Sequence, residues 1–214
     1  MNKNSNSNIN NADYCNIIIN ILLYFFIYSF WGWAFETIYM SVYHGHIVKR
    51  GFLIGPLCGI YGIGTISIIY MLNRIKSHPF MLFLCSSVIS SILELLTGII
   101  FKTFFNQRLW DYSNKFANFK GYICLPNTII WGILALFLVY VAHPAVKKTV
   151  DLIPARVRKI IFSSALIFFS FDLYISIYTS LNGINNIVWL TQLYTNKLKE
   201  LHNISLKVVY YFNH

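Results

Sequence analysis

Five long runs of apolar residues set the strongest constraint on how this chain can fold. An α-helix needs about 20 such residues to cross the hydrocarbon core of a bilayer, whereas a barrel strand needs only about 10. Because all backbone polar groups must be satisfied within the membrane, helices are the default for runs of this length. We therefore predict an all-α, polytopic integral membrane helix bundle with about five transmembrane helices, at residues 16–43, 56–72, 79–101, 122–142 and 159–181.

The composition excludes the common soluble classes of protein. Hydrophobic residues make up 57% of the chain and charged residues 11%, whereas roughly a quarter of a typical soluble domain is charged. An ordinary cytosolic enzyme, a secreted disulfide scaffold and a disordered tail are excluded. The four cysteines lack the C-x-x-C spacing of a zinc site, so we expect neither a metal nor a cofactor.

The net charge of +10 comes from basic residues that lie between the apolar runs. This arrangement is typical of the positive-inside bias and of contact with anionic lipid headgroups. We therefore expect membrane lipids as partners and no nucleic acid. The densest basic cluster lies between the fourth and fifth runs, which favours a cytoplasmic location for that face and for the N-terminus.

The two ends of the chain differ in character from the apolar core. Residues 1–15 form a polar, Asn-rich lead, and residues 182–214 form a mixed tail without a spanning run. Apolar residues of the tail recur at helical spacing, which predicts either an amphipathic helix at the membrane interface or a flexible end. The sequence has no internal repeat and no second domain.

Three acidic residues lie inside apolar runs, each displaced from the middle of its run toward the same face of the membrane: Glu36, Glu94 and Asp172. A carboxylate at this depth costs a few kcal/mol and needs a partner or a wet cavity. Small and polar residues share the helix face of each acid. Two interpretations stay open: neutralised acids within helix contacts, or a solvated site that binds a cation, a proton or a polar headgroup.

The second run carries a stripe of small residues. Gly55, Gly59 and Gly62 follow an i, i+4, i+7 spacing, which places them on one face of a helix. This pattern predicts close packing of the second helix against a neighbour, with contact between exposed backbone and a ligand as the alternative. Pro56 is suited to the first turn of a helix, so we expect the helix to begin at Gly55-Pro56.

The linker after the third run is rich in aromatic and polar residues. It contains Trp110, Asp111, Tyr112 and Asn118, and it is either a structured or re-entrant loop or a simple aromatic anchor at the interface. Asp111 can accept a hydrogen bond from Arg108 or cap a short helix. Arg50 and Arg108 are the natural counter-charges for the buried acids.

Three sequence blocks together resemble a known family. They are G-W-x-x-E from Gly32, R-G-F-L-x-G-P-x-C-x-I-Y-G-x-G from Arg50, and E-x-x-x-G from Glu94, followed by W-D-Y-S and N-x-x-G. These blocks, within residues 29–132, resemble the putative ABC transporter type IV permease family, the CmpB-type small bacterial membrane proteins. Gly59 stands where that family usually has proline. The resemblance implies a multi-pass protein of the bacterial inner membrane.

The resemblance favours a permease-like transport subunit, with the three acids lining a polar site. The sequence has no nucleotide-binding motif, so we expect any ATPase to be a separate subunit and the small bundle to form a homo-oligomer. Two alternatives stay open. One is a non-catalytic assembly or regulatory protein. The other is an intramembrane enzyme for a lipid-linked substrate, with Glu94 as base and both arginines on a phosphate. No nucleophile motif is present, so we assign no catalytic residue.

Overall fold

The computed structural model describes residues 11–182, and its side chains from Tyr14 onward. Within that part, four helices are long and apolar enough to cross a membrane: Tyr14–His44, Pro79–Phe105, Leu125–Asp151 and Ala155–Leu181. In residues 11–182, the only strands form one short antiparallel pair. The predicted all-α membrane bundle is therefore confirmed. The predicted C-terminal interfacial helix lies outside the described residues.

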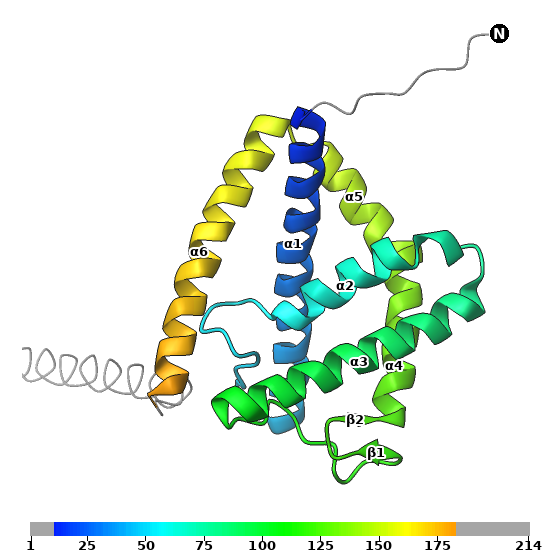
Figure 1. Cartoon of the computed structure of the whole chain (residues 1–214), viewed down its shortest axis with the longest axis vertical. Helices are drawn as coiled ribbons and strands as arrows, with labels where there is room; N and C mark the ends of the chain where they lie inside the picture. Colours follow the sequence, from blue (N-terminus) through cyan, green and yellow to red (C-terminus); the bar gives the residue numbers. More distant parts are fainter. Residues whose placement is uncertain (1–10, 183–214) are drawn as a thin grey trace, which may run out of the picture.

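The elements follow one another along the chain as four long helices with shorter pieces between them (Figure 1). The third long helix is divided into α4, a π-helical turn η2 and α5. In order, the elements are α1 (Asn11–His44), α2 (Gly59–Met71), η1 (Asn73–Ile75), α3 (Pro79–Phe105), β1 (Asn118–Phe119), β2 (Ile123–Cys124), α4 (Leu125–Phe137), η2 (Leu138–Ala142), α5 (His143–Asp151) and α6 (Ala155–Leu181).

The second helix is shorter than the sequence predicts. It begins at Gly59 and has 13 residues, too few to cross a bilayer alone. The expectation that it begins at Gly55-Pro56 is wrong, because the preceding backbone finds other partners. The amides of Ile54 and Gly55 donate to Asp172 on α6, and the amide of Cys58 donates to a carbonyl of α1. Residues 51–58, called here the 51–58 segment, therefore run outside any helix up to the start of α2.

The turn η2 (Leu138–Ala142) has a local cause. Pro144 lies in the first turn of α5, has no amide hydrogen and crowds the carbonyl four residues before it. A π turn widens the helix at that point and is a usual response to such an interruption. The helix continues as α5, so the span from Leu125 to Asp151 is preserved.

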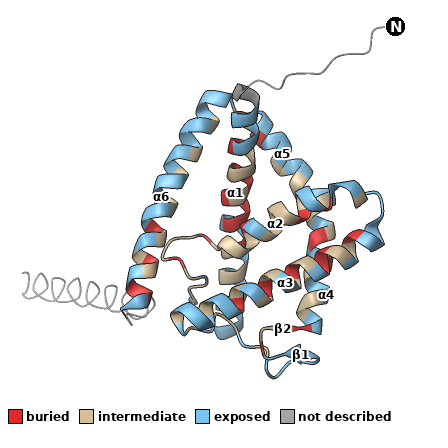
Figure 2. Cartoon of the chain, viewed as in Figure 1, coloured by how far each residue is buried: buried red, intermediate tan, exposed pale blue. Residues whose placement is uncertain are grey.

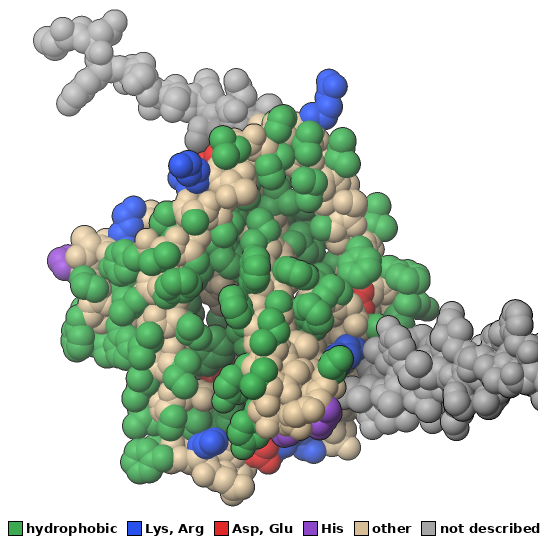
Figure 3. All heavy atoms as spheres, turned by 180° about the vertical axis from the view of Figure 1, so that it is seen from behind, with side chains coloured by type: hydrophobic (Ala, Val, Ile, Leu, Met, Phe, Trp, Pro, Cys, Tyr) green, Lys and Arg blue, Asp and Glu red, His purple; other side chains and the backbone are tan. Residues whose placement is uncertain are grey.

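Helix α1 is the centre of the bundle. It packs mainly against α2 and α6, and α3 packs mainly against α4. The start of α1, the end of α5 and the start of α6 lie together at one end of the molecule, with the β1–β2 loop and the C-terminal ends of α1 and α6 toward the other (Figure 1). Buried residues concentrate on α1 and α3, whereas most of the upper half of α6 is exposed (Figure 2). On the face shown in Figure 3, many hydrophobic side chains cover the surface between the two ends, as a bilayer requires.

Glycine allows close contact between helices at several places, two of which are on α2 and α4. A β-carbon at Gly62 on α2 would overlap Ser29 and Phe25 of α1, and one at Gly132 on α4 would overlap Ser87 and Phe83 of α3. Gly62 thus packs as its stripe indicates. Gly59 only approaches Phe25 at the limit of contact, 4.0 Å, and Gly55 lies outside the helix, against Asp172. Of the three glycines in the predicted stripe, only Gly62 packs α2 closely against α1. Gly55 makes room for Asp172 instead, and Gly59 makes no close contact.

Candidate intramembrane site

Glu94 is the most deeply buried acid on the membrane-spanning helices. It lies on α3 and is 3% exposed. Its Oε1 accepts a hydrogen bond from the Tyr112 hydroxyl at 3.0 Å. Trp131 and Asn127 of α4 lie beside the same carboxyl, but Oε2 and the Trp131 indole nitrogen have no hydrogen bond of good geometry. Oε2 of this buried carboxyl therefore has no well-formed hydrogen bond, although Trp131 and Asn127 are close enough to interact with the carboxyl.

The sequence of α3 explains why Glu94 points inward. The buried positions of the helix are mostly small or polar and recur every three or four residues, so they form one face. That face packs on α4, where Ser91 exchanges a hydrogen bond with Thr128 at 2.8 Å. Helix contacts within membranes are enriched in such residues because they let backbones approach closely. The buried members of this face are Leu82, Ser86, Ser87, Ser90, Glu94 and Gly98.

Glu36 of α1 forms an ion pair with Arg50. The Arg50 Nη2 and Nε donate to Glu36 Oε1 at 2.6 and 2.9 Å, and both side chains are largely covered, at 23% and 22% exposure. The Tyr61 hydroxyl of α2 donates to Glu36 Oε2 at 3.3 Å. Gly32, one turn before Glu36, leaves the space that the Tyr61 ring occupies. The charge of Glu36 is thus neutralised.

These two acids belong to one network. The Tyr61 ring lies 5.5 Å from that of Trp131, which is itself beside Glu94, and the carboxyls of Glu36 and Glu94 interact electrostatically. Four helices and two linkers contribute to this arrangement. We call it the Glu94 cluster, and it comprises Glu36, Arg50, Tyr61, Glu94, Tyr112 and Trp131.

The aromatic linker is a structured loop that holds Tyr112 over Glu94. The Trp110 indole donates to the carbonyl of Tyr122 at 2.8 Å. Asp111 accepts from the Ser113 amide and hydroxyl at 2.9 and 2.5 Å and from Arg108 at 2.8 Å. The hydrogen bonds from Ser113, with the nearby guanidinium, lower the pKa of the Asp111 carboxyl. Burial beside Glu94 raises the pKa of the Tyr112 hydroxyl above its usual range.

The tip of the loop is closed by Asn118 and Gly121. The Asn118 amide group donates to two carbonyls of the loop, and its oxygen accepts from the Gly121 amide at 3.2 Å. Gly121 has a positive φ of 74°, and a β-carbon there would lie 2.7 Å from Asp111. Glycine is the residue that tolerates both conditions. Asn118 thus shapes the loop and lies outside the Glu94 cluster.

Asp172 forms a separate centre on α6. It is 5% exposed and accepts the amides of Ile54 at 2.9 Å and Gly55 at 3.0 and 3.1 Å. Lys49 precedes the same segment, and burial lowers its pKa while the charge of Asp172 opposes that effect. Asp172 therefore holds a backbone segment, whereas Glu94 faces side chains.

The structure divides the predicted site residues into three groups. Glu36, Glu94, Arg50 and Tyr112 meet in the Glu94 cluster, Asp172 binds the 51–58 segment, and the remaining candidates (Arg108, Trp110, Asp111 and Asn118) build the loop. Sequence reasoning missed Tyr61 and Trp131 as members of the cluster, because aromatic residues are common throughout this chain. Within residues 11–182, no group of three or more His, Cys, Asp and Glu side chains could hold a metal ion.

The chain matches a known protein family over most of its length. A family model described as "Putative ABC-transporter type IV" matches residues 23–177. The chain belongs to this family. The match extends the resemblance noted in the sequence from residues 29–132 to nearly all of α1 through α6, and it includes the Glu94 cluster and Asp172. Neither a curated protein nor a solved structure matches the chain. The chain is thus a membrane protein of an ABC-transporter-type family.

Proposed function

We propose that the chain is a permease-like transport subunit of the bacterial inner membrane, in which Glu94 binds a positively charged species. The observation that carries the proposal is Oε2 of Glu94, which has no well-formed hydrogen bond on a side chain that is 3% exposed. A buried polar atom without a hydrogen bond is costly. A proton or a cationic group of a solute would remove that cost.

The charges around Glu94 support a cation rather than an anion. Glu36 is paired with Arg50 at 2.6 Å, so this pair contributes no net charge. The ion pairs found in residues 14–182 are Arg50–Glu36 and Arg108–Asp111, and neither involves Glu94. The Glu94 cluster therefore holds one carboxyl more than it holds bases. Anions would be repelled by this excess.

The side chains around Glu94 are also suited to a cation. Trp131 and Tyr61 present aromatic rings, whose faces attract ammonium and guanidinium groups. The Tyr112 hydroxyl can accept a hydrogen bond while it donates its own to Glu94. The loop that carries Tyr112 covers one side of the site. We propose that movement of this loop admits the cation.

Energy for transport would come from another subunit. The sequence contains no G-x-x-x-x-G-K-[ST] motif, the phosphate-binding loop of many ATPases. The family description names a class of ABC transporter, and such transporters couple membrane subunits to an ATPase. We therefore propose a separate ATPase partner, and homo-oligomerisation of a bundle this small.

The first experiment is purification of the protein with native lipids, followed by mass spectrometry of every small molecule retained. Wild type is compared with Glu94→Gln, and Asp151→Asn is the matched control because Asp151 is an exposed acid of α5. A cationic compound retained by wild type and Asp151→Asn but lost from Glu94→Gln would support the proposal. Equal retention by all three proteins would contradict it.

A flux assay distinguishes a proton from a larger cation as the species that binds Glu94. Proteoliposomes are loaded with a pH-sensitive dye and then assayed with the retained compound, with and without a co-expressed ATPase. Proton movement that depends on Glu94 but on no compound identifies the proton, and uptake of the compound identifies the solute. If Glu94→Gln is folded and neither movement differs from wild type, the cluster serves helix packing instead.

A further inference from the structure

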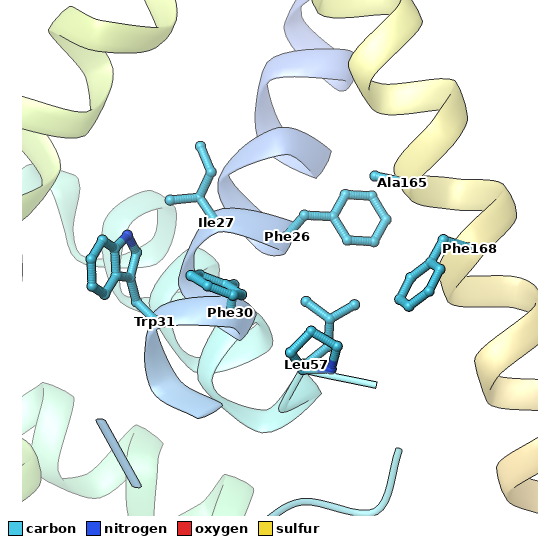
Figure 4. A pocket seen from close by; sticks show the side chains of 8 residues that line it. Phe26, Ile27, Phe30, Trp31, Leu57, Ala165 and Phe168 are labelled. Atoms are coloured by element: carbon cyan, nitrogen blue, oxygen red, sulfur yellow. The ribbon is translucent and has the colours of Figure 1, made fainter. Parts of the chain in front are cut away.

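An apolar groove lies between α1, α6 and the 51–58 segment. Its volume is about 320 Å³. All of its lining side chains are hydrophobic, and several of them, such as Trp31 and Phe168, are half exposed, so the groove opens sideways. Figure 4 shows Phe26 of α1 facing Phe168 of α6, with Leu57 below them and Trp31 on the side of α1 away from α6. The lining residues include Phe26, Trp31, Pro56, Leu57, Ala165 and Phe168.

The depth of the groove places it against hydrocarbon. Phe26 and Trp31 lie near the middle of the span Tyr14–His44, and Ala165 and Phe168 lie near the middle of the span Ala155–Leu181. An apolar cavity does not hold water, which needs polar partners. The groove is large and apolar enough to hold part of an acyl chain.

The backbone that forms one wall of the groove can face an acyl chain. The amides of Ile54 and Gly55 are bound by Asp172, Pro56 has no amide hydrogen, and the amides of Leu57 and Cys58 donate to carbonyls of Gly55 and Ser29. Irregular backbone at membrane depth is costly when its polar groups lack partners. Here every amide from Ile54 to Cys58 is satisfied.

A cationic side chain lies above the groove on the same helix face. Arg158 precedes Ala165 by seven residues, or two helical turns, which is about 10 Å along α6. Its Nη1 donates to Asn20 Oδ1 of α1 at 3.0 Å, so Arg158 bridges the two helices that form the groove. Arg158 lies ten residues, or about 15 Å, from the middle of α6 at Phe168. This is half the thickness of the hydrocarbon core, so the bridge lies at the boundary between hydrocarbon and headgroups.

The surroundings of Arg158 attract anions. Five basic residues and one acid lie between positions 147 and 159, and none forms an ion pair in the part of the chain that the structure describes. Such clusters attract anionic lipids. The residues are Lys147, Lys148, Asp151, Arg156, Arg158 and Lys159.

We propose that this groove is a binding site for one anionic phospholipid. The phosphate binds Arg158 beside Asn20, and one acyl chain lies in the groove against Pro56 and Leu57. The lipid thus packs directly against the segment that Asp172 holds. This site is separate from the Glu94 cluster and does not depend on its proposed function.

The test is native mass spectrometry of purified protein with phosphatidylglycerol or phosphatidylcholine as probe. Wild type is expected to retain one phosphatidylglycerol at least tenfold more tightly than phosphatidylcholine. Ala165→Trp fills the groove and should weaken phosphatidylglycerol tenfold or more, whereas Ile167→Trp, at a position 72% exposed on the same helix, should not. Arg158→Gln should remove the preference for phosphatidylglycerol, and Arg156→Gln should retain it.

Two further variants distinguish a change in lipid binding from a loss of folding or of transport. If Ala165→Trp does not fold, Ala165→Leu fills part of the groove with less strain and should weaken binding in the same direction. Glu94→Gln should bind the lipid as wild type does, whatever its effect on transport. Equal lipid retention by the Ala165 and Ile167 variants would overturn the proposal. A dimer that Ala165→Trp disrupts, without retained lipid, would also overturn it and assign the groove to a second copy.

Discussion

Asp172 binds the backbone amide of Gly55 with both of its carboxylate oxygens, at 3.1 and 3.0 Å, although the two residues are 117 positions apart in the chain. The carboxylate accepts hydrogen bonds from backbone amides that would donate to backbone carbonyls in a helix or a sheet. A β-carbon at Gly55 would lie 2.8 Å from Asp172 Oδ2, so the contact also needs glycine. The last long helix thereby fixes the path of the chain between the first two.

Replacing Asp172 should release the 51–58 segment. Hydrogen bonds to charged groups contribute about 1.5–3 kcal/mol each, and every 1.4 kcal/mol is a factor of ten in an equilibrium. In Asp172→Ala we expect the amides of Ile54 and Gly55 to exchange with deuterium at least tenfold faster than in wild type. Asp172→Asn, which keeps one acceptor oxygen, should have a smaller effect. Unchanged exchange in Asp172→Ala would show that other contacts hold the segment.

The Glu36–Arg50 pair should be coupled in stability. Both side chains are partly covered, so the pair is screened less than an exposed one. A double-mutant cycle with Glu36→Gln and Arg50→Gln should give a coupling free energy of about 1 kcal/mol, measured by thermal or denaturant unfolding in detergent. The exposed Arg108–Asp111 pair is the comparison and should give less. Additive single mutants would mean that the 2.6 Å contact contributes nothing to stability.

Adding a methyl group at Gly62 or Gly132 should destabilise the bundle. Either β-carbon would overlap a neighbouring helix, and overpacking of this kind costs about 1–3 kcal/mol. Gly64→Ala is the matched control, because its β-carbon would meet Leu93 at an ordinary 3.7 Å and alanine favours the helix. We expect unfolding temperatures to fall for Gly62→Ala and Gly132→Ala and to hold or rise for Gly64→Ala. The reverse order would contradict the helix contacts described here.

Tyr112→Phe should destabilise the protein through Glu94. The substitution removes the hydrogen bond from the Tyr112 hydroxyl to Oε1 of Glu94 at 3.0 Å, and leaving a buried oxygen without its donor costs about 1–3 kcal/mol. Tyr174→Phe on α6 is the control because Tyr174 is 68% exposed. The free energy of unfolding should fall only for the Tyr112 variant. Combining Tyr112→Phe with Glu94→Gln should cost less than the sum of the two.

Acid should loosen the loop that carries Tyr112. Hydrogen bonds from Ser113 lower the pKa of Asp111 in the folded protein, below the usual value of about 3.9. A group with a depressed pKa stabilises the fold above its unfolded pKa, and that contribution is lost as the pH falls through the folded pKa. Pepsin should therefore cut residues 106–121 faster as the pH drops below about 4, relative to a free peptide of that sequence. Asp111→Asn should show a weaker pH dependence, since residue 111 no longer titrates.

Hydropathy predicts the fold well because the bilayer leaves few alternatives. Four of the five runs become long helices whose ends differ from the expected ones by a few residues, or by nine where α5 continues past residue 142. The prediction is wrong for the second run, because hydropathy contains no information about hydrogen-bond partners that are distant in the chain. Nothing near Gly55 indicates that its amide will bond to a carboxylate more than a hundred residues later.

The candidate site could be predicted only in part. The cost of burying a charge singled out Glu36, Glu94 and Asp172, and the preference of Arg for carboxylates indicated Arg50. Helical spacing cannot tell which of three acids on different helices meet, so it grouped Asp172 with the others. Tyr61 lies in the site because Gly32 on another helix makes room for it, and such complementarity between distant positions is invisible in a single sequence.

The short α2 also has a consequence for biosynthesis. The 51–58 segment and α2 emerge from the ribosome long before Asp172, and at about 5–20 residues per second the 117 intervening positions take roughly 6–23 s to translate. During that interval the amides of Ile54 and Gly55 lack their native acceptor, and α2 is too short to insert stably alone. The N-terminal half of the protein can therefore reach its final form only after the last helix has been made. A nascent chain stalled before residue 172 should leave this segment open to labelling from the aqueous side.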